Sequence, residues 1–526
     1  MIWRQFGRFA RRRTASVILV FVLAFAGSAI ITLTKGVPEP YFTDEHSYLL
    51  AADTFSQGRL TNPTHPMWVH FESFHINQQP TYASKFPPGQ GLFLALGQVL
   101  TGYPIVGVWL SMALMCAAIT WMLQAWIPAR WALIGGLISI FHLYLGIASY
   151  WGQSYMGGAV AAFGGALFFG AWRRLIRKPD FKISLVLALG LAVMANSRPW
   201  EGFVVCAPAL VVLIVFIIQR ATKGKFKEIF NTAITPIATV IIIIFAAMGY
   251  YNYRVTGNAF LTSYQVHQET YDIAPHFIWQ EPRLNRTYNH KVISDFQRYL
   301  RMKRYERYLS PEGFTGTTIW KLKTMWTFFG SVILGIPIIC ALFWIFRDRW
   351  LRFACFTILI YLVATIFSTF FNTYYTAPIV CLVFLLIMQG LRVISRVRIS
   401  RNYIGKYIVS LILIICIGLF VRKFTDLPSQ KYLRKHYQNI QITELVKGLK
   451  KEGGDHLVIV RYVEGHDPRD EWVYNEADID RSSIVWAREM DQENNRKLLK
   501  YFKGRKAWLL IIGPYNSPVR FYSYPK

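Results

Sequence analysis

The stretch ASVILVFVLAFAGSAIITLT, residues 15–34, decides the fold, because it is long, apolar and free of charge. About 20 such residues are needed for a helix to cross the hydrocarbon core of a bilayer. Inside that core every backbone polar group must bond within its own segment, so the run must be a helix. Arg11, Arg12 and Arg13 precede it, and no small-residue cleavage site follows before Lys35. We therefore expect an uncleaved first span rather than a signal peptide.

Further apolar runs follow along the 526-residue chain, so the sequence predicts a polytopic membrane protein. We expect an all-α membrane fold with about eleven transmembrane helices. After the first span, the predicted spans are residues 104–126, 131–149, 154–172, 183–196, 202–218, 234–251, 326–346, 351–371, 375–391 and 404–421.

The charge of the short loops predicts the orientation of these helices. The N-terminus and four short loops are basic, and the positive-inside rule puts such segments in the cytoplasm. Eleven spans satisfy all these assignments together, and they place two long loops, about 35–103 and 252–323, on the outer face with the C-terminal tail. The four basic loops are residues 173–182, 220–227, 347–352 and 392–406.

One apolar stretch, residues 89–100, is too short to cross a bilayer. Counting it as a span would also reverse the orientation of every later loop. We interpret it as an interfacial or re-entrant helix at the outer surface.

The sequence of the C-terminal tail indicates a small α/β domain. Residues 1–422 form the transmembrane module in this interpretation, and residues 423–526 form a separate domain on the outer face. Its predicted elements are short strands at 457–460, 484–487 and 508–512, with a helix at 493–502. Asn475, Asp478 and Asp480 are typical of surface turns.

The formal net charge is +29, from 58 Lys and Arg against 29 Asp and Glu. In a soluble protein such a balance would suggest nucleic acid. Here much of it lies in short loops between apolar runs, so orientation explains it better and we expect no nucleic-acid partner. The chain also lacks a P-loop, a dinucleotide fingerprint and a serine-hydrolase elbow, which argues against a soluble nucleotide-sugar enzyme.

The most informative polar motif is TDEHSY, residues 43–48, about nine residues after the first span. Thr43 can cap a helix, and acids in the first turn suit the helix dipole, so Asp44 and Glu45 are explained equally well by a helix start. A second motif, KFPPG at residues 85–89, directly precedes the short apolar helix.

Lys85 in this second motif has two interpretations. A lysine at a membrane surface usually extends its amine to the interface or meets lipid head groups. Here Pro87 and Pro88 stiffen the backbone beside it. A fixed cation at that depth can hold and neutralise a lipid-linked phosphate.

The order and spacing of these motifs after the first span resemble the GT-C superfamily, most nearly its ArnT-like and protein O-mannosyltransferase-like (PMT) branch. The resemblance covers residues 1–422 as architecture, with specific motifs at 44–50 and 85–89. It implies a glycosyltransferase that moves a hexose or pentose from a polyprenyl-phosphate donor to a lipid, glycan or protein acceptor, usually with inversion. It also fits our predicted localisation, an inner (plasma) membrane of a bacterium, with membrane lipid around the site.

The resemblance further implies roles for the motif residues. Asp44 would act on the acceptor hydroxyl as a general base, and Glu45 would support it or share a metal. Lys85 would bind the donor phosphate, the leaving group, whose charge grows in the transition state. His46, beside the two acids, is a candidate substrate contact.

Several residues have less support. Arg198, in NSRPWE between two spans, is either a second phosphate ligand or an ion-pair partner of Glu201. Arg59 would face phosphate or remain a solvated surface residue. Tyr374 and Tyr375 precede the tenth span, where aromatic belt anchors are the default, although the family often places substrate contacts there.

Metal dependence stays open at the level of sequence. His65, His70 and His75 recur at five-residue intervals, a poor helical spacing for metal ligands. The family branch often carries a second acid in the loop before the fourth span. In this chain that loop has no acid, and Gln153 is its nearest polar substitute and a candidate substrate contact. A divalent cation therefore remains an open cofactor.

Two other classes of function compete with a glycosyltransferase. A polytopic transporter is the main alternative, although the spans carry few charges and show no inverted repeat. A structural or assembly protein whose tail binds a partner is the other. The structural class predicts that replacing Asp44 with Asn leaves activity intact. A transporter would instead accumulate substrate in sealed vesicles without a chemically altered product.

Overall fold

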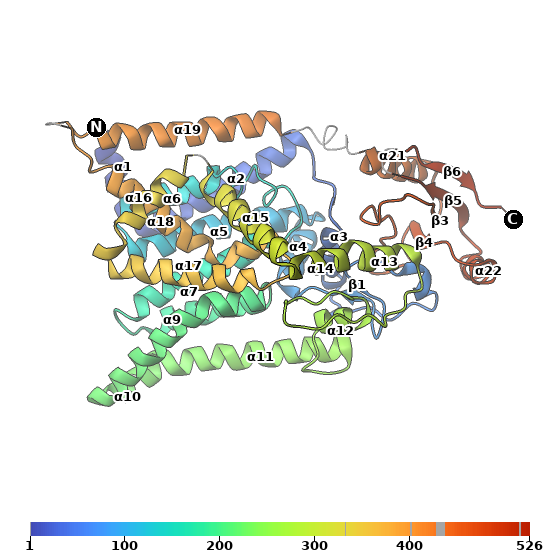
Figure 1. Ribbon diagram of the computed structural model, residues 1–526, viewed down its shortest axis with the longest axis horizontal. Helices are drawn as coiled ribbons and strands as arrows, with labels where there is room; N and C mark the ends of the chain where they lie inside the picture. Colours follow the sequence, from blue (N-terminus) through green and yellow to red (C-terminus); the bar gives the residue numbers. More distant parts are fainter. Residues whose placement is uncertain (1, 332, 400–401, 428–436, 515–516, 526) are drawn as a thin grey trace.

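The computed structural model describes residues 2–331, 333–399, 402–427, 437–514 and 517–525. A large helical body lies at one end of the long axis, and a small domain with a β-sheet lies at the other (Figure 1). The fold class predicted from the sequence, a mostly helical multi-span membrane protein with a small C-terminal sheet domain, is therefore confirmed.

In the described part of the chain, six helices are long and apolar enough to cross a membrane, or seven if one bent pair counts as a span. The bent pair is α15 (Pro311–Gly330) with α16 (Gly335–Phe343). The six are α2 (Arg13–Lys35), α5 (Ile105–Trp126), the run from α9 to α11 (Pro199–Thr256), α17 (Arg349–Ile366), η6 with α18 (Thr373–Ile394) and α19 (Ile404–Asp426).

The predicted number of about eleven is too high by this measure. The run Pro199–Thr256 contains two predicted spans, α9 (Pro199–Arg220) and α11 (Thr235–Thr256), which leave the same tip of the molecule (Figure 1). Gly224, with a φ of 74°, helps to turn the chain there. The tip consists of η2 (Ala221–Lys225), α10 (Phe226–Ile229) and η3 (Phe230–Ile234).

Three other predicted spans do not meet this measure of length and apolarity. α6 (Ala129–Phe141) and α8 (Phe181–Ala195) have only 13 and 15 residues. α7 (Gly158–Leu175) ends in Arg173 and Arg174, and 15 of its 18 residues are buried inside the bundle. The two predictions around residue 150 extended too far, because residues 142–157 form turns, as where Ser149 Oγ accepts from the backbone N–H of Trp151.

Short elements fold the two long loops. The predicted helix at 89–100 is present as α4 (Pro88–Thr101), which packs against α3 (Thr43–Ser56) and α5. Its place at a membrane surface stays a prediction. The other short elements are α1 (Ile2–Arg11), α3 (Thr43–Ser56), η1 (Trp68–Phe71), β1 (Ile76–Asn77), β2 (Ala83–Ser84), α12 (Ser263–Thr270), α13 (Lys291–Asp295), η4 (Phe296–Met302), α14 (Lys303–Leu309) and η5 (Ile345–Arg347).

The C-terminal domain is a four-stranded mixed sheet in the order β4-β3-β5-β6. β3 is parallel to both β4 and β5, and β6 is antiparallel to β5. The three predicted strands and the predicted helix are confirmed, whereas β6 and α21 were not predicted. The bounds are α21 (Tyr437–Glu452), β3 (His456–Tyr462), β4 (Ile484–Arg488), α22 (Gln492–Tyr501), β5 (Lys506–Ile512) and β6 (Arg520–Ser523).

Strand β3 is buried on both faces, because different elements cover each side. Val458 and Val460 pack with Leu449 of α21 on one face. Leu457 and Ile459 face the other way, since side chains alternate along a strand. They share a core with α22 and with side chains of the first long loop, Leu50, Phe71, Ile76 and Tyr82. The C-terminal domain is thus packed directly against that loop.

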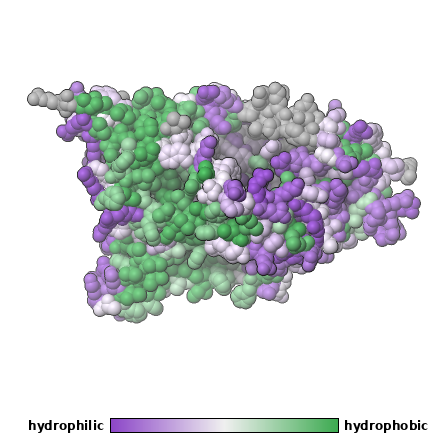
Figure 2. All heavy atoms as spheres, in the orientation of Figure 1, coloured by the Kyte–Doolittle hydropathy of each residue, from purple (hydrophilic) through white to green (hydrophobic). Residues whose placement is uncertain are grey.

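Apolar side chains gather over the helical body, and hydrophilic ones cover the end that holds the C-terminal domain (Figure 2). A narrower hydrophilic edge closes the opposite end of the helical body (Figure 2). An apolar band between two polar ends is the arrangement expected of a protein surrounded by lipid.

Candidate active site

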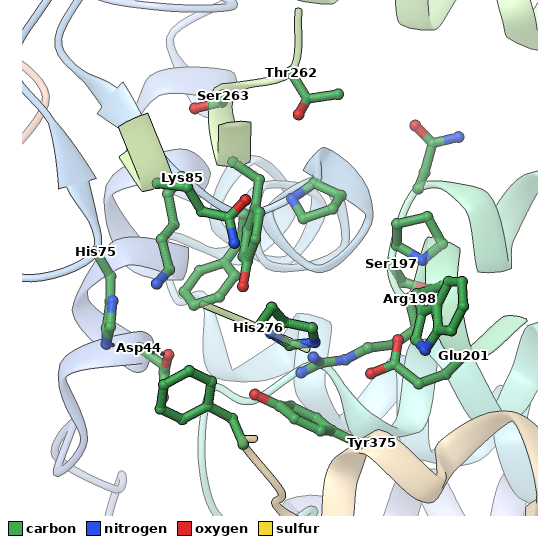
Figure 3. A pocket seen from close by; sticks show the side chains of 18 of the residues that line it. Asp44, His75, Lys85, Ser197, Arg198, Glu201, Thr262, Ser263, His276 and Tyr375 are labelled. Carbon is green, nitrogen blue, oxygen red and sulfur yellow. Dashed lines mark ion pairs between the residues drawn. The ribbon is translucent and has the colours of Figure 1, made fainter. Parts of the chain in front are cut away.

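A cavity of about 470 Å³ lies where the helical body meets the two long loops. Its walls come from segments far apart in the sequence: α3, the KFPPG motif, the turn before α9, the second long loop and η6. Asp44, His75 and the amine of Lys85 lie at one end, and Arg198 and Glu201 lie at the other (Figure 3).

Asp44 reaches the cavity from the first turn of α3. Its Oδ1 lies 3.5 Å from Nε2 of His75. Its Oδ2 accepts a hydrogen bond of 3.4 Å from the hydroxyl of Tyr374. The carboxylate thus has a neighbour on each oxygen and remains 22% exposed, so a ligand in the cavity can reach it.

Lys85 is 4% exposed, and its amine lies over the rings of Phe86 and Tyr264, 5.2 and 5.4 Å from their centroids. Within the described ranges of the chain, no hydrogen bond or ion pair engages this amine. Burial lowers the pKa of Lys85 to about 8, against the opposing effect of Asp272. The amine is therefore a cation at neutral pH that has water or a ligand in the cavity as its partner.

Arg198 occupies the opposite end, directly before α9. Its guanidinium lies over the rings of Tyr374 and Tyr375, 4.5 and 4.6 Å from their centroids. Its Nη2 is buried without a hydrogen-bond partner among the described residues. A guanidinium stays charged at every physiological pH, so this is a second cation with unused donors.

A third cation, Arg301, comes from the second long loop. Its Nη1 lies 3.2 Å from Oδ1 of Asp272, which is 4% exposed. Burial alone would raise the pKa of Asp272, but Arg301, His267 and Lys85 lower it to about 2. Asp272 is therefore a fixed anion that holds Arg301 at the cavity wall.

Positive charge exceeds negative charge around the cavity. Four cationic side chains line it against two carboxylates. Asp272, which is not part of the lining, pairs with Arg301, so one positive charge stays uncompensated. The cations are Lys85, Arg198, Arg301 and Arg304, and the carboxylates are Asp44 and Glu201. Burial lowers the pKa of His276, also in the wall, to about 4, so that ring is neutral at pH 7. An anionic ligand is favoured.

A chain of hydrogen bonds fixes the position of Lys85 relative to α3. Ser47, one turn after the carboxylate on α3, donates to the carbonyl of His75 at 2.6 Å and lies 2.7 Å from Oγ of Ser84. The backbone N–H of Lys85 donates to the same His75 carbonyl at 3.1 Å. The two sequence motifs, at residues 43–48 and 85–89, are therefore joined by hydrogen bonds through the carbonyl of His75.

Glu45 points away from the cavity, although it directly follows Asp44. Successive residues on a helix are about 100° apart, so the two side chains diverge. Glu45 is fully buried and accepts hydrogen bonds from the backbone N–H groups of Tyr41, Phe42 and Tyr155 and from the hydroxyl of Tyr150. It joins the start of α3 to residues 150–155.

Three other predicted residues also lie outside the cavity lining. His46 stacks on Tyr474 of the C-terminal domain, with ring centroids 3.8 Å apart. Gln153 donates to the carbonyl of Ile147 within its own turn. Arg59 is bonded to Gln57 beyond the far end of α3, about 20 Å of helix away from Asp44.

The evenly spaced histidines diverge. His65 contacts Asp480 of the C-terminal domain, His70 bonds to the carbonyl of Arg488, and His75 faces Asp44. In the described residues, no group of three or more His, Cys, Asp or Glu side chains could hold a metal ion. With its excess of cationic side chains, the cavity does not suit a divalent cation.

Asp272, Arg301, Arg304 and His276 were not selected from the sequence. Arg301 and Arg304 belong to a basic stretch of the second long loop, and no local signal separates them from the other cations around them. Their spacing of three residues, which puts both on one helical face, was the available clue.

No protein-family model matches the chain, and no curated protein matches it in sequence. Its structure is similar to that of ArnT from Cupriavidus metallidurans in the apo state, with a TM-score of 0.52 and 12% identity over 93% of this chain and 92% of that chain. It is also similar to ArnT from Cupriavidus metallidurans bound to undecaprenyl phosphate, with a TM-score of 0.51 and 10% identity over 94% and 92%. These likenesses concern the fold, and the PMT-like branch stays a prediction. The chain therefore has the GT-C-like fold seen in ArnT.

Proposed function

We propose that this protein is a membrane glycosyltransferase that moves a sugar from a polyprenyl-phosphate donor to an acceptor hydroxyl. The observation that carries the proposal is the cavity itself, which brings an accessible carboxylate, Asp44, together with an excess of cationic side chains. The ArnT structure bound to undecaprenyl phosphate supports a donor of this lipid class.

Asp44 is the proposed general base. The acceptor oxygen attacks the anomeric carbon and forms the new glycosidic bond, while its proton passes to the Asp44 carboxylate. A sugar or lipid hydroxyl is a poor nucleophile, and a positioned base contributes roughly 10²–10⁴-fold in rate. With one carboxylate exposed on this side of the cavity, a single displacement with inversion follows.

The cations serve the other end of the breaking bond. The bond between the anomeric carbon and the phosphate oxygen breaks, and polyprenyl phosphate leaves with both electrons of that bond. Lys85, Arg198 and Arg301 are placed to bind the phosphate as its charge increases. Fixed cations in a poorly hydrated site stabilise such charge without having to reorganise.

The basic short loops support an orientation with the cavity at the outer face. Lys223, Lys225 and Lys227 lie at the tip between α9 and α11, which is at the opposite end of the helical body from the C-terminal domain (Figure 1). The positive-inside rule puts that tip in the cytoplasm. Donor and acceptor would then meet at the outer boundary of the membrane.

The test is transfer of label by purified protein in lipid nanodiscs. Radiolabelled polyprenyl-phosphate sugars, hexoses and pentoses, are offered together with lipid, glycan and peptide acceptors. Asp44→Asn should lose at least about a hundredfold in kcat. Asp295→Asn, a carboxylate outside the cavity, should match wild type. Unchanged transfer by Asp44→Asn, or unmodified substrate accumulating in sealed vesicles without product, would reject the proposal.

A further inference from the structure

His75 connects the two halves of the cavity chemistry. Its ring faces the Asp44 carboxylate, with 3.5 Å between Nε2 and Oδ1 (Figure 3). Its backbone carbonyl accepts from Ser47 on α3 and from the N–H of Lys85. One residue therefore touches both the candidate base and the segment that carries the candidate phosphate ligand.

The backbone of His75 is in an unusual conformation. Its φ is 64°, in the left-handed region that few residues other than Gly, Asn, Asp and His occupy. Such a conformation persists only where the surroundings enforce it, and it clusters at functional sites. Here the two hydrogen bonds to its carbonyl hold the backbone, and the resulting geometry directs the ring to Asp44.

The protonation of the ring suits an orienting contact. Burial, with smaller effects from Lys85, Arg301 and His267, lowers the pKa of His75 well below its usual value, so the ring is neutral at pH 7. Nδ1 is buried without a hydrogen-bond partner among the described residues. The proton is therefore best placed on Nε2, which faces the Asp44 carboxylate at 3.5 Å.

A neutral donor has a specific advantage beside a general base. An ammonium or guanidinium beside a carboxylate favours its ionised form and so makes it a weaker base. A neutral imidazole on one oxygen and the phenol of Tyr374 on the other restrict the rotation of the carboxylate but leave its charge in place.

We propose that His75 is a positioning residue for Asp44, which fixes the carboxylate in the orientation that receives the acceptor proton. This inference rests on the proposed glycosyl transfer. A positioning role differs from a merely structural one, because replacing His75 should then slow turnover only while the Asp44 carboxylate is present.

His75→Gly is the sharpest test, because glycine accepts the left-handed backbone and keeps the carbonyl that binds Ser47 and Lys85. Loss of the imidazole should lower kcat by about a hundredfold, the scale of a misplaced catalytic group. The KM for the donor should stay within about twofold, since the cations are untouched. Thermal unfolding and elution as a single species check the fold.

The double variant Asp44→Asn/His75→Gly separates positioning from an independent role. If His75 acts through Asp44, the double variant is as slow as Asp44→Asn alone. If the two losses multiply, or if His75→Gly turns over like wild type, the proposal is wrong. If the glycine variant does not fold, His75→Asn replaces it, because Asn also tolerates this backbone conformation. The amide nitrogen of Asn is one bond nearer to Cα than Nε2 of His, so it does not reach as far toward Asp44.

The wild-type reaction in the same assay separates a failure of the proposed function from a failure of the proposed role of His75. Absence of transfer by wild type, with every donor offered, would remove the proposed function itself. Transfer by wild type with an unchanged His75→Gly rate would remove only the role of His75.

Discussion

The backbone N–H of Gly89 donates a 2.7 Å hydrogen bond to the carbonyl oxygen of Asn196. This bond joins the KFPPG motif, which carries Lys85, to the turn that carries Arg198. The two cations are more than a hundred residues apart in sequence, and their separation across the cavity depends on this contact. A side chain at Gly89 has no room, because its Cβ would lie 2.5 Å from the Asn196 oxygen.

Gly89→Ala should therefore weaken donor use. The backbone must shift to relieve the contact, which moves Lys85 relative to Arg198. We expect kcat/KM for the donor to fall roughly tenfold to a hundredfold, as for other misplaced groups, while Asp44 stays in place. Steady-state kinetics with varied donor concentration measure the loss.

Gly316→Ala is the matched control, because nothing lies within 4 Å of a Cβ at that helical position. It should leave donor kinetics unchanged. Wild-type kinetics in Gly89→Ala would mean that the two motifs do not have to be held at this separation.

The lowered pKa of Lys85 predicts that donor binding depends on pH. Its pKa is lowered to about 8, chiefly by burial, so the amine is charged below pH 8 and loses its charge as the pH rises through that value. Polyprenyl-phosphate affinity should be highest below pH 8 and fall above it. His276, in the same wall, does not contribute there, because its pKa is about 4.

Lys85→Met should remove this dependence. Its affinity should be lower at pH 7 by roughly tenfold to a hundredfold, the value of a hydrogen bond to a charged group, and nearly flat from pH 7 to 9.5. Binding of a fluorescent polyprenyl phosphate measures it, with Lys291→Met, 83% exposed, as control. A decline above pH 8 that persists in Lys85→Met would assign the dependence to another group.

Part of the site was predictable because short motifs carry it. Asp44, Lys85, Arg198, Tyr374 and Tyr375 were all selected from the sequence, and all line one cavity. Each lies beside a span or a proline-rich turn, so its position along the chain already restricts its position in space. Their chemical roles remain proposals.

The rest depends on contacts between distant segments. Arg301 reaches the cavity only because the second long loop folds back over the first and Asp272 anchors it. His75 faces Asp44 because of a left-handed backbone that the sequence around it does not signal. Helical periodicity alone could have separated Asp44 from Glu45, since neighbours on a helix point in different directions.

Substitution of Asp44 should remove transfer, whereas substitution of Glu45 should lower the stability of the fold. Glu45 is buried with four donors directed at its carboxylate, and Glu45→Ala would leave these donors unpaired at a cost of about 1–3 kcal/mol each. We expect a lower melting temperature and a loosened 150–155 turn. Asp44→Asn should retain the wild-type melting temperature and lose transfer. Thermal unfolding beside the transfer assay compares them, and an unfolding temperature lowered equally in both would contradict this division.

The C-terminal domain should support the site through α3. Tyr474 stacks on His46 with an interplanar angle of 1°, and the backbone N–H of Ala477 donates to Asp53 near the other end of that helix at 2.7 Å. Burial lowers the pKa of His46 to about 3, so the stacked ring is neutral and the contact should not depend on pH above 5.

Tyr474→Ala removes the ring that stacks on His46, two residues after Asp44. It should reduce kcat about tenfold with little change in donor KM. Tyr474→Phe keeps the ring and should match wild type. Equal rates for the two variants would show that α3 holds Asp44 in place without this domain.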